Sequence, residues 1–120
     1  KGKYIEPSVL ESYFGKVTEF QQLCIVGLGL DQPILLAVPT EIAKNDKNTV
    51  NKKLSELLNE VNSDLDAYKK IKKIVMVNDE WLPENGLATP TLKIKRAKID
   101  ERFSESYTDW YSSENDIIWE

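Results

Sequence analysis

The pattern of apolar and polar positions predicts three helices, the longest of them near the middle of the chain. Within residues 45–73, apolar side chains recur at helical spacing on one stripe, while lysine, glutamate and asparagine occupy the other face. The stripe consists of Val50, Leu54, Leu57, Leu58, Val61 and Leu65. Asn48 or Thr49 is placed to cap the start of this helix. The lysines between 69 and 73 are typical of a solvated helix end, close to the negative terminus of the dipole.

A shorter helix is predicted toward each end of the chain. Ser8 and Glu11 have the spacing of a capping box and apolar residues follow at helical intervals, so the first helix is expected over residues 8–16. The last helix is indicated by a stripe after the basic residues 93–98, made up of Ile99, Phe103, Tyr107, Trp110 and Tyr111. An aromatic stripe at this spacing is typical of core packing and not of a cofactor site.

Three short apolar runs predict strands. The runs "LCIVGLG" (residues 23–29) and "PILLAVP" (residues 33–39) are bounded by Gly, Asp or Pro, which indicates a hairpin at the centre of the sheet. "IVMV" (residues 74–77) is the third strand, and the tail "NDIIWE" either adds a short strand or packs on the surface. The expected fold is a small α/β (α+β) domain, with a sheet of about three strands flanked by helices and an N-terminal loop or hairpin segment.

Composition narrows the classes of function. The 120 residues suit one compact domain, and the net charge of -4 at pH 7 argues against a nucleic-acid-binding protein. With no histidine and one cysteine, a zinc site or a histidine-based triad lacks its ligands or its base, so no metal site is expected. Cys24 lies inside an apolar run, which favours a buried thiol. No apolar run approaches the ~20 residues that span a bilayer, and no signal-peptide pattern opens the chain.

Two segments carry candidate chemistry. In "KGKYIEPSVLE" (residues 1–11), Gly2 permits backbone conformations closed to other residues and Pro7 suits the start of a helix. In "NGLATPTLKIKR" (residues 85–96), a glycine turn and a proline-stiffened turn place Lys93 on a defined loop. A lysine in such a loop acts as a movable point charge toward phosphate or carboxylate. Taken separately, the first segment is also explained as a strand before a capped helix, and the second as a solvated surface.

Together, "GKYIEPSVLE" and "GLATPTLKIKR" resemble two signature segments of the AMP-forming acyl-CoA synthetase (adenylate-forming) superfamily. In that family a glycine-containing loop runs into a proline and then a glutamate, which correspond to Gly2, Pro7 and Glu11. A later threonine- or serine-rich turn is followed by lysine, an aliphatic residue, one further residue and arginine, which correspond to residues 91–96. The variant "TPTLKIKR" is similar to the long-chain fatty acyl-CoA synthetase branch.

The resemblance implies that residues 1–120 form the mobile C-terminal (lid) domain of a long-chain fatty acid–CoA ligase, cut just after the hinge. Its partner is then the N-terminal adenylation domain of the same chain. Lys93 is the implied catalytic lysine for acyl-adenylate formation from fatty acid and ATP. After rotation of the domain, Gly2, Lys3 and Tyr4 are implied to line the channel for coenzyme A (CoA) during thioester formation. ATP, Mg²⁺ and CoA belong to the full-length enzyme; none is expected to bind tightly to this domain alone, which is expected to be inactive.

Two departures from the family pattern affect these expectations. Leu92 stands where the family usually has a glycine before the lysine, so a less flexible loop is expected. The charged hinge residue of the family would precede Gly2 and lies outside this sequence. Of the remaining basic residues in the stretch, Lys95, Arg96 and Lys98 are expected to be supporting or solvated.

Two other functions stay open on the sequence. One is a stand-alone α/β binding or regulatory module whose basic loop docks on the acidic surface of a partner. The other is an adenylate-forming ligase for a different carboxylic acid, because the acyl pocket belongs to the missing domain. The chain begins without methionine, which is consistent with a fragment. A cytoplasmic location is expected, with peripheral membrane association left open.

Overall fold

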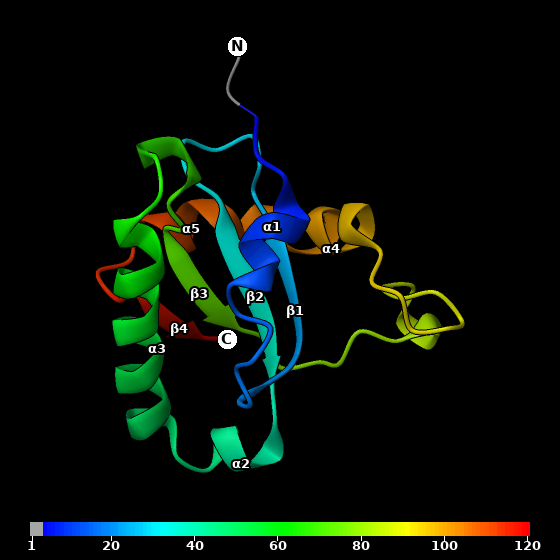
Figure 1. Ribbon diagram of the computed structural model, residues 1–120. Coiled ribbons are helices and arrows are strands. Elements are labelled where there is room, and N and C mark those ends of the chain that lie inside the picture. Colours follow the sequence, from blue (N-terminus) through cyan, green and yellow to red (C-terminus); the bar gives the residue numbers. More distant parts are fainter. Residues whose placement is uncertain (1–3) are drawn as a thin grey trace.

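The computed structural model describes residues 4–120, which form a sheet with helices on both of its faces (Figure 1). The α-helices and strands are α1 (Pro7–Ser12), β1 (Phe20–Val26), β2 (Ile34–Pro39), α2 (Glu41–Lys44), α3 (Lys47–Ser63), β3 (Lys73–Met76), α4 (Arg96–Phe103), α5 (Tyr107–Ser112) and β4 (Ile117–Trp119). Short 3₁₀ turns lie at Ala67–Lys69, Pro83–Asn85 and Ser104–Ser106. The expected α/β fold class is confirmed.

The sheet has the strand order β1-β2-β3-β4, so it contains four strands where about three were expected. β1 and β2 are antiparallel, and the two remaining pairs are parallel. The tail adds the fourth strand, with Ile117 opposite Ile74. The β1–β2 hairpin forms as predicted, but it does not lie at the centre, because β1 is an edge strand. β2 and β3 are central, and every residue of both is buried.

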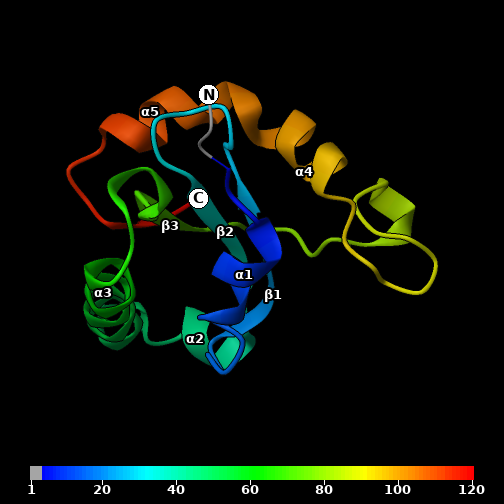
Figure 2. The ribbon, with the colours of Figure 1, turned by 45° about the horizontal axis from the view of Figure 1, so that its top comes forward.

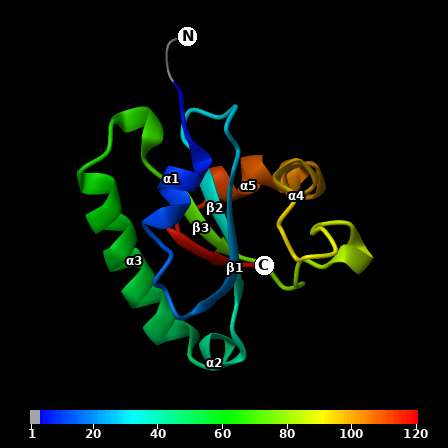
Figure 3. The same ribbon diagram turned by 45° about the vertical axis from the view of Figure 1, so that its right-hand side comes forward.

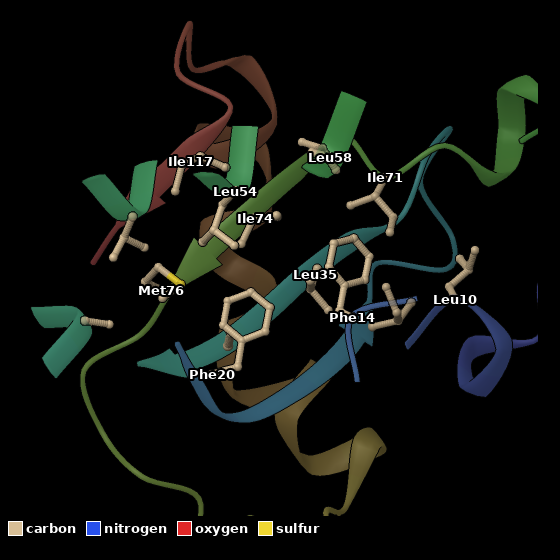
Figure 4. Packing of buried hydrophobic residues seen from close by; sticks show 14 residues of the cluster. Leu10, Phe14, Phe20, Leu35, Leu54, Leu58, Ile71, Ile74, Met76 and Ile117 are labelled. Carbon is tan, nitrogen blue, oxygen red and sulfur yellow. The ribbon is translucent and has the colours of Figure 1, made fainter. Parts of the chain in front are cut away.

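Each face of the sheet carries its own hydrophobic core. Along β2, Leu35 and Ala37 belong to one cluster, and Leu36 and Val38 belong to the other, because successive side chains of a strand point to opposite faces. α1, α2 and α3 cover the first face, where Phe14, which follows α1, packs into the cluster seen in Figure 4. α4 and α5 cover the second face, and Figure 2 shows the sheet between these two helical layers.

The first helix is shorter than predicted and is not capped by Ser8. It begins at Pro7, which occupies the first turn as expected, and ends at Ser12. Its N-cap residue is Glu6, with no side-chain cap hydrogen bond. The carboxylate of Glu11 is instead used elsewhere, as an acceptor for the backbone N–H of Ile25 at 2.8 Å. The capping-box interpretation was therefore wrong, because a long-range partner takes the side chain that the box requires.

The long helix also differs from the prediction at both ends. α3 begins at Lys47 after the N-cap Asp46, so neither Asn48 nor Thr49 caps it. The lysine run beyond it is not uniformly solvated. Lys73 belongs to β3, is 4% exposed, and its Nζ donates to the carbonyl oxygens of Ser113 and Asn115 at 2.7 and 2.8 Å. Burial lowers the pKa of Lys73.

The last predicted helix is interrupted. α4 ends at Phe103 and α5 begins at Tyr107, with the 3₁₀ turn of Ser104–Ser106 between them. Serine weakens a helix because its hydroxyl competes for backbone groups, and Ser104 Oγ donates to the carbonyl of Glu101 at 3.4 Å. The aromatic stripe nevertheless packs against the second face of the sheet, which confirms its structural role.

Candidate functional site

The basic stretch folds into a short hairpin that carries Lys93. The N–H of Thr89 donates to the carbonyl of Lys93 at 2.8 Å, and the N–H of Leu92 donates to the carbonyl of Thr89 at 2.7 Å. Residues 90–92 therefore form a three-residue loop, a length that commonly combines a turn with one left-handed residue. Below the loop, Ala88 pairs with Ile94 in an antiparallel bridge.

Leu92 is that left-handed residue. Its φ of 67° makes it the single non-glycine residue with positive φ within residues 4–120. Glycine adopts this conformation without a steric penalty, whereas a residue with a Cβ atom loses roughly 1–2 kcal/mol. The backbone of the loop thus has the shape that a glycine would favour, but a leucine occupies the position. The side chain of Leu92 is 59% exposed.

Lys93 is presented to solvent from an anchored base. Leu87 and Ala88 are buried at the start of the hairpin, and the N–H of Lys95 donates to the carbonyl of Leu87 at 3.0 Å. The side chain of Lys93 is exposed, and no hydrogen bond or ion pair holds it among the described residues 4–120. In Figures 1 and 3 the hairpin, drawn in yellow, projects from the side of the molecule. This arrangement leaves the ammonium group available to a partner outside the domain.

Arg96, directly after the hairpin, joins the two segments that carry the sequence resemblance. Its guanidinium group forms an ion pair with Glu11 of α1, in which Nη1 contacts Oε2 and Nη2 lies 3.4 Å from Oε1. Nη1 also donates to the carbonyl of Ile25 in β1 at 2.9 Å. Burial alone would lower the pKa of Arg96, but the hydrogen bond and charge of Glu11, together with Cys24, outweigh it and raise the pKa.

The Glu11–Arg96 pair lies against the edge strand β1. Glu11 accepts from the N–H of Ile25, and Arg96 donates to the carbonyl of the same residue. An edge strand has free backbone groups on its outer side, and here the ion pair satisfies both groups of one residue. The start of α4, the end of α1 and β1 are consequently linked at one point. Arg96 was expected to be supporting or solvated, and the structure assigns it a supporting role.

Cys24 is buried beneath this pair, as expected. It is 1% exposed, and Nη1 of Arg96 lies 3.5 Å from its Sγ. Burial raises the pKa of the thiol from 9.0 to about 12, although the nearby Arg96 opposes part of this effect. The thiol is therefore protonated and shielded at neutral pH, which does not suit a nucleophile.

This shift predicts a loss of stability in alkaline solution. The folded state retains the thiol proton more strongly than the unfolded state, so the stabilisation is complete below pH 9.0 and is lost as the pH rises toward about 12. Urea unfolding at a series of alkaline pH values measures the decline. Burial also raises the pKa of Tyr107, so this residue lowers the stability in the same direction as the pH rises. Comparison with Cys24→Ala isolates the contribution of the thiol. An equally steep decline in Cys24→Ala would contradict the prediction.

The N-terminal segment is described only from Tyr4 onward, so the predicted positions Gly2 and Lys3 lie outside the described residues. Tyr4 is 71% exposed. It lines a cavity of about 130 Å³ together with Val9 and Tyr13 of the α1 region and with Lys69. In Figures 1 and 3, the described chain that leads into α1 and the Lys93 hairpin lie on different parts of the molecule. The structure thus brings together Glu11 and Arg96, but not Tyr4 and Lys93.

Neither a metal site nor a membrane span is apparent in the part of the chain that the structure describes. No group of three or more Asp, Glu, Cys or His side chains is arranged to hold a metal ion within residues 4–120. No helix within the same residues combines the length and apolar character needed to cross a bilayer.

The Glu11–Arg96 pair was the feature that sequence reasoning missed. Both residues were named in the two signature segments, but 85 positions separate them and no local pattern connects them. The available signal was chemical: the first segment contains an acidic residue and the second a basic one, each next to buried positions. Such residues are rarely buried without a partner.

Comparison with known proteins gives one family and several relatives. Residues 1–115 match the model of the AMP-binding enzyme C-terminal domain. The chain is 28% identical over 131 residues to the peroxisomal long chain acyl-CoA synthetase 6 of Arabidopsis thaliana, covering 92% of this chain. It is 26% identical over 132 residues to long-chain-fatty-acid–CoA ligase 5 of Rattus norvegicus, covering 94% of this chain. The chain spans 19% of the length of each of these two proteins.

A solved structure shares the fold. The A-PCP didomain of carboxylic acid reductase from Segniliparus rugosus, in complex with AMP, superimposes with a TM-score of 0.74 and 23% identity. The match covers 92% of this chain and 16% of that one. At this identity the similarity establishes the architecture of the domain.

Proposed function

Because the chain belongs to the family of AMP-binding enzyme C-terminal domains, we propose that it is the mobile lid domain of a long-chain fatty acid–CoA ligase. The two relatives from Arabidopsis thaliana and Rattus norvegicus are named as a long-chain acyl-CoA synthetase and a long-chain fatty acid–CoA ligase, which supports this acid class. The chain spans 19% of their length, so the proposal includes an N-terminal adenylation domain as the partner within the same protein.

The proposed reaction has two half-reactions. In the first, the carboxylate of the fatty acid attacks the α-phosphorus of ATP, the bond to the β-phosphate breaks, and pyrophosphate leaves. In the second, the thiol of CoA attacks the acyl carbon of the adenylate, its proton is lost, and AMP leaves. The first half-reaction brings two anions together, so a cation between them stabilises the charge of the transition state.

The single observation that carries the proposal is the presentation of Lys93. Its ammonium group stands free on an anchored hairpin, with no intramolecular acceptor among residues 4–120. A lysine carries a compact charge on a long stem, which suits a group that enters a site only when the domain closes. We assign Lys93 the role of the cation between the carboxylate and the α-phosphate.

The described part of this domain is not suited to hold the Mg²⁺ that the reaction implies. No cluster of carboxylates within residues 4–120 is arranged for Mg²⁺, so no step is assigned to a metal held here. ATP, Mg²⁺ and the fatty acid are proposed to bind to the adenylation domain. This domain contributes Lys93 to the first half-reaction and the loop containing Gly2, Lys3 and Tyr4 to the CoA channel in the second.

The proposal is tested by measuring the half-reactions separately in the full-length enzyme. Pyrophosphate release from ATP and fatty acid reports the first, and conversion of supplied acyl-adenylate to thioester reports the second. Lys93→Ala is expected to lose the first and keep the second. A variant that keeps both half-reactions contradicts the assignment of Lys93.

Gly2→Leu is expected to give the opposite pattern. A leucine side chain would narrow the path of the CoA thiol, so thioester formation from supplied acyl-adenylate should fall about tenfold or more while pyrophosphate release is retained. Lys16→Leu, which adds the same side chain at an exposed position after α1, is the matched control and should leave both rates unchanged. Normal thioester formation in Gly2→Leu would remove Gly2 from the proposed channel.

A cytoplasmic location is part of the proposal. One of the similar relatives is a peroxisomal enzyme, so the location is a property to be measured on the full-length protein. Fractionation of cells that express it, with separation of cytosol, membranes and peroxisomes, tests this point directly.

A further inference from the structure

Thr89 bonds to both backbone polar groups of Lys93. Its N–H donates to the carbonyl of Lys93 at 2.8 Å, and its Oγ1 accepts from the N–H of Lys93 at 3.0 Å. Its own carbonyl accepts from the N–H of Leu92 at 2.7 Å. One residue at the entry of the loop therefore fixes the returning strand at three points. The hydroxyl group is the part of this arrangement that depends on the identity of the side chain.

The loop that Thr89 closes is under conformational strain. Leu92, immediately before Lys93, has a φ of 67°, a conformation that a leucine does not favour by itself. A strained backbone conformation persists only where the surrounding contacts hold it in place. The hydrogen bonds from the N–H groups of Leu92 and Lys93 to Thr89 are such contacts. The Thr89 hydroxyl also lies 3.2 Å from the hydroxyl of Thr91, inside the same loop. Loss of the Thr89 hydroxyl would remove the side-chain contact that holds the N–H after Leu92.

We infer that Thr89 is a positioning residue, whose hydroxyl group directs Lys93 toward the reacting carboxylate and α-phosphate. The inference rests on the proposed function of Lys93. The ammonium group lies at the end of a flexible stem and has no partner to orient it among residues 4–120, so its direction is set at the backbone. Misplacement of a reacting group by about 1 Å can cost about 10²-fold in rate, and a rotated Lys93 peptide would produce a shift of this kind.

Thr89→Val tests the inference, because valine keeps the β-branched shape and removes the hydroxyl. In the full-length enzyme, kcat for pyrophosphate release is expected to fall about 10- to 100-fold. The KM values for ATP and fatty acid should change less than about threefold, because the lost contact acts at the transition state. Thioester formation from supplied acyl-adenylate should stay unchanged. Thr89→Ser restores the hydroxyl and should recover kcat to within about threefold.

Thr108→Val is the matched control. Thr108 is an exposed residue of α5, outside the hairpin, and its substitution should leave both half-reactions at wild-type rates. The retained thioester step shows at the same time that Thr89→Val is folded. Thermal unfolding of each variant gives a second check on folding.

The possible outcomes separate this inference from the proposed function. If Lys93→Ala loses pyrophosphate release while Thr89→Val retains it, Lys93 acts as proposed and the positioning role of Thr89 is wrong. If Thr89→Val loses both half-reactions equally, or if Thr89→Ser does not recover kcat, Thr89 has a structural role only and the inference fails. If Lys93→Ala retains pyrophosphate release, the proposed function itself fails.

Discussion

Lys93→Ala is expected to lower the rate of acyl-adenylate formation by about 10²- to 10³-fold, the usual effect of removing a preorganised group that stabilises developing charge. Thioester formation from supplied acyl-adenylate should remain, because the lysine is assigned no part in it. KM for ATP should change little, since the substrates are proposed to bind to the adenylation domain. The side chain of Lys93 has no hydrogen-bond or ion-pair partner within residues 4–120, and alanine keeps the backbone bonds to Thr89, so the substitution should leave the stability of the domain unchanged.

Two further substitutions make this experiment specific. Lys98→Ala removes an exposed lysine five positions later, which lies 3.7 Å from Glu101 in a surface ion pair, and should leave both half-reactions unchanged. Lys93→Arg keeps the charge but changes its shape and reach, so partial recovery is expected and full recovery is not. Equal losses in Lys93→Ala and Lys98→Ala would mean that the total positive charge of the segment matters, and the assignment to one lysine would then be abandoned.

Arg96→Ala is expected to destabilise the domain by about 2–3 kcal/mol. The substitution removes a charge-assisted pair with Glu11 and a hydrogen bond to the carbonyl of Ile25. Breaking a fully buried pair costs about 3–5 kcal/mol, but the side chains of Arg96 and Glu11 are 36% and 21% exposed, so water screens part of the interaction. Urea unfolding of the domain measures the change in the free energy of unfolding.

Lys98→Ala is again the control, because its ion pair with Glu101 lies in the same helix and is more exposed, at 58% and 76%. It should cost less than about 1 kcal/mol. In a double-mutant cycle, Glu11→Ala and Arg96→Ala should be strongly non-additive, with a coupling energy of at least about 1 kcal/mol. Additive effects would show that the two side chains stabilise the domain independently.

Local patterns predicted most elements because their causes lie within a few residues. The apolar stripe of α3 and the short apolar run of β2 are both local patterns, which depend on residues only a few positions apart. The order of the strands depends on pairing between distant segments, which periodicity does not contain. The three residues of β4 are too few to show a period, and their pairing with β3 decides that they form a strand.

The errors at single residues have the same origin. Glu11 has capping-box spacing, but its carboxylate bonds to Ile25 and Arg96 across the fold. Lys73 follows a helix in a lysine-rich run, but the carbonyl groups of Ser113 and Asn115 satisfy its ammonium group and allow burial. In both cases a partner far along the chain outweighs a local preference.

The candidate site was predicted in part. The sequence identified Lys93 and the turn before it, and it drew attention to Leu92 as a replacement for glycine. It did not predict that Leu92 would retain a left-handed conformation, or that Thr89 would bond to the backbone N–H and carbonyl of Lys93. Those features depend on hairpin geometry that composition alone does not determine. The assignments of Gly2, Lys3 and Tyr4 stay predictions.

The link between Glu11 and Arg96 also has an evolutionary consequence. The two residues satisfy the N–H and the carbonyl of Ile25 as one unit, so replacing either alone leaves the other charge without its partner. Homologues that lose the arginine should therefore lose the glutamate as well. A charge-reversed pair would be tolerated only if it still formed hydrogen bonds with both backbone groups of the residue at position 25. Across an alignment of this family, these two columns are expected to vary together although 85 positions separate them.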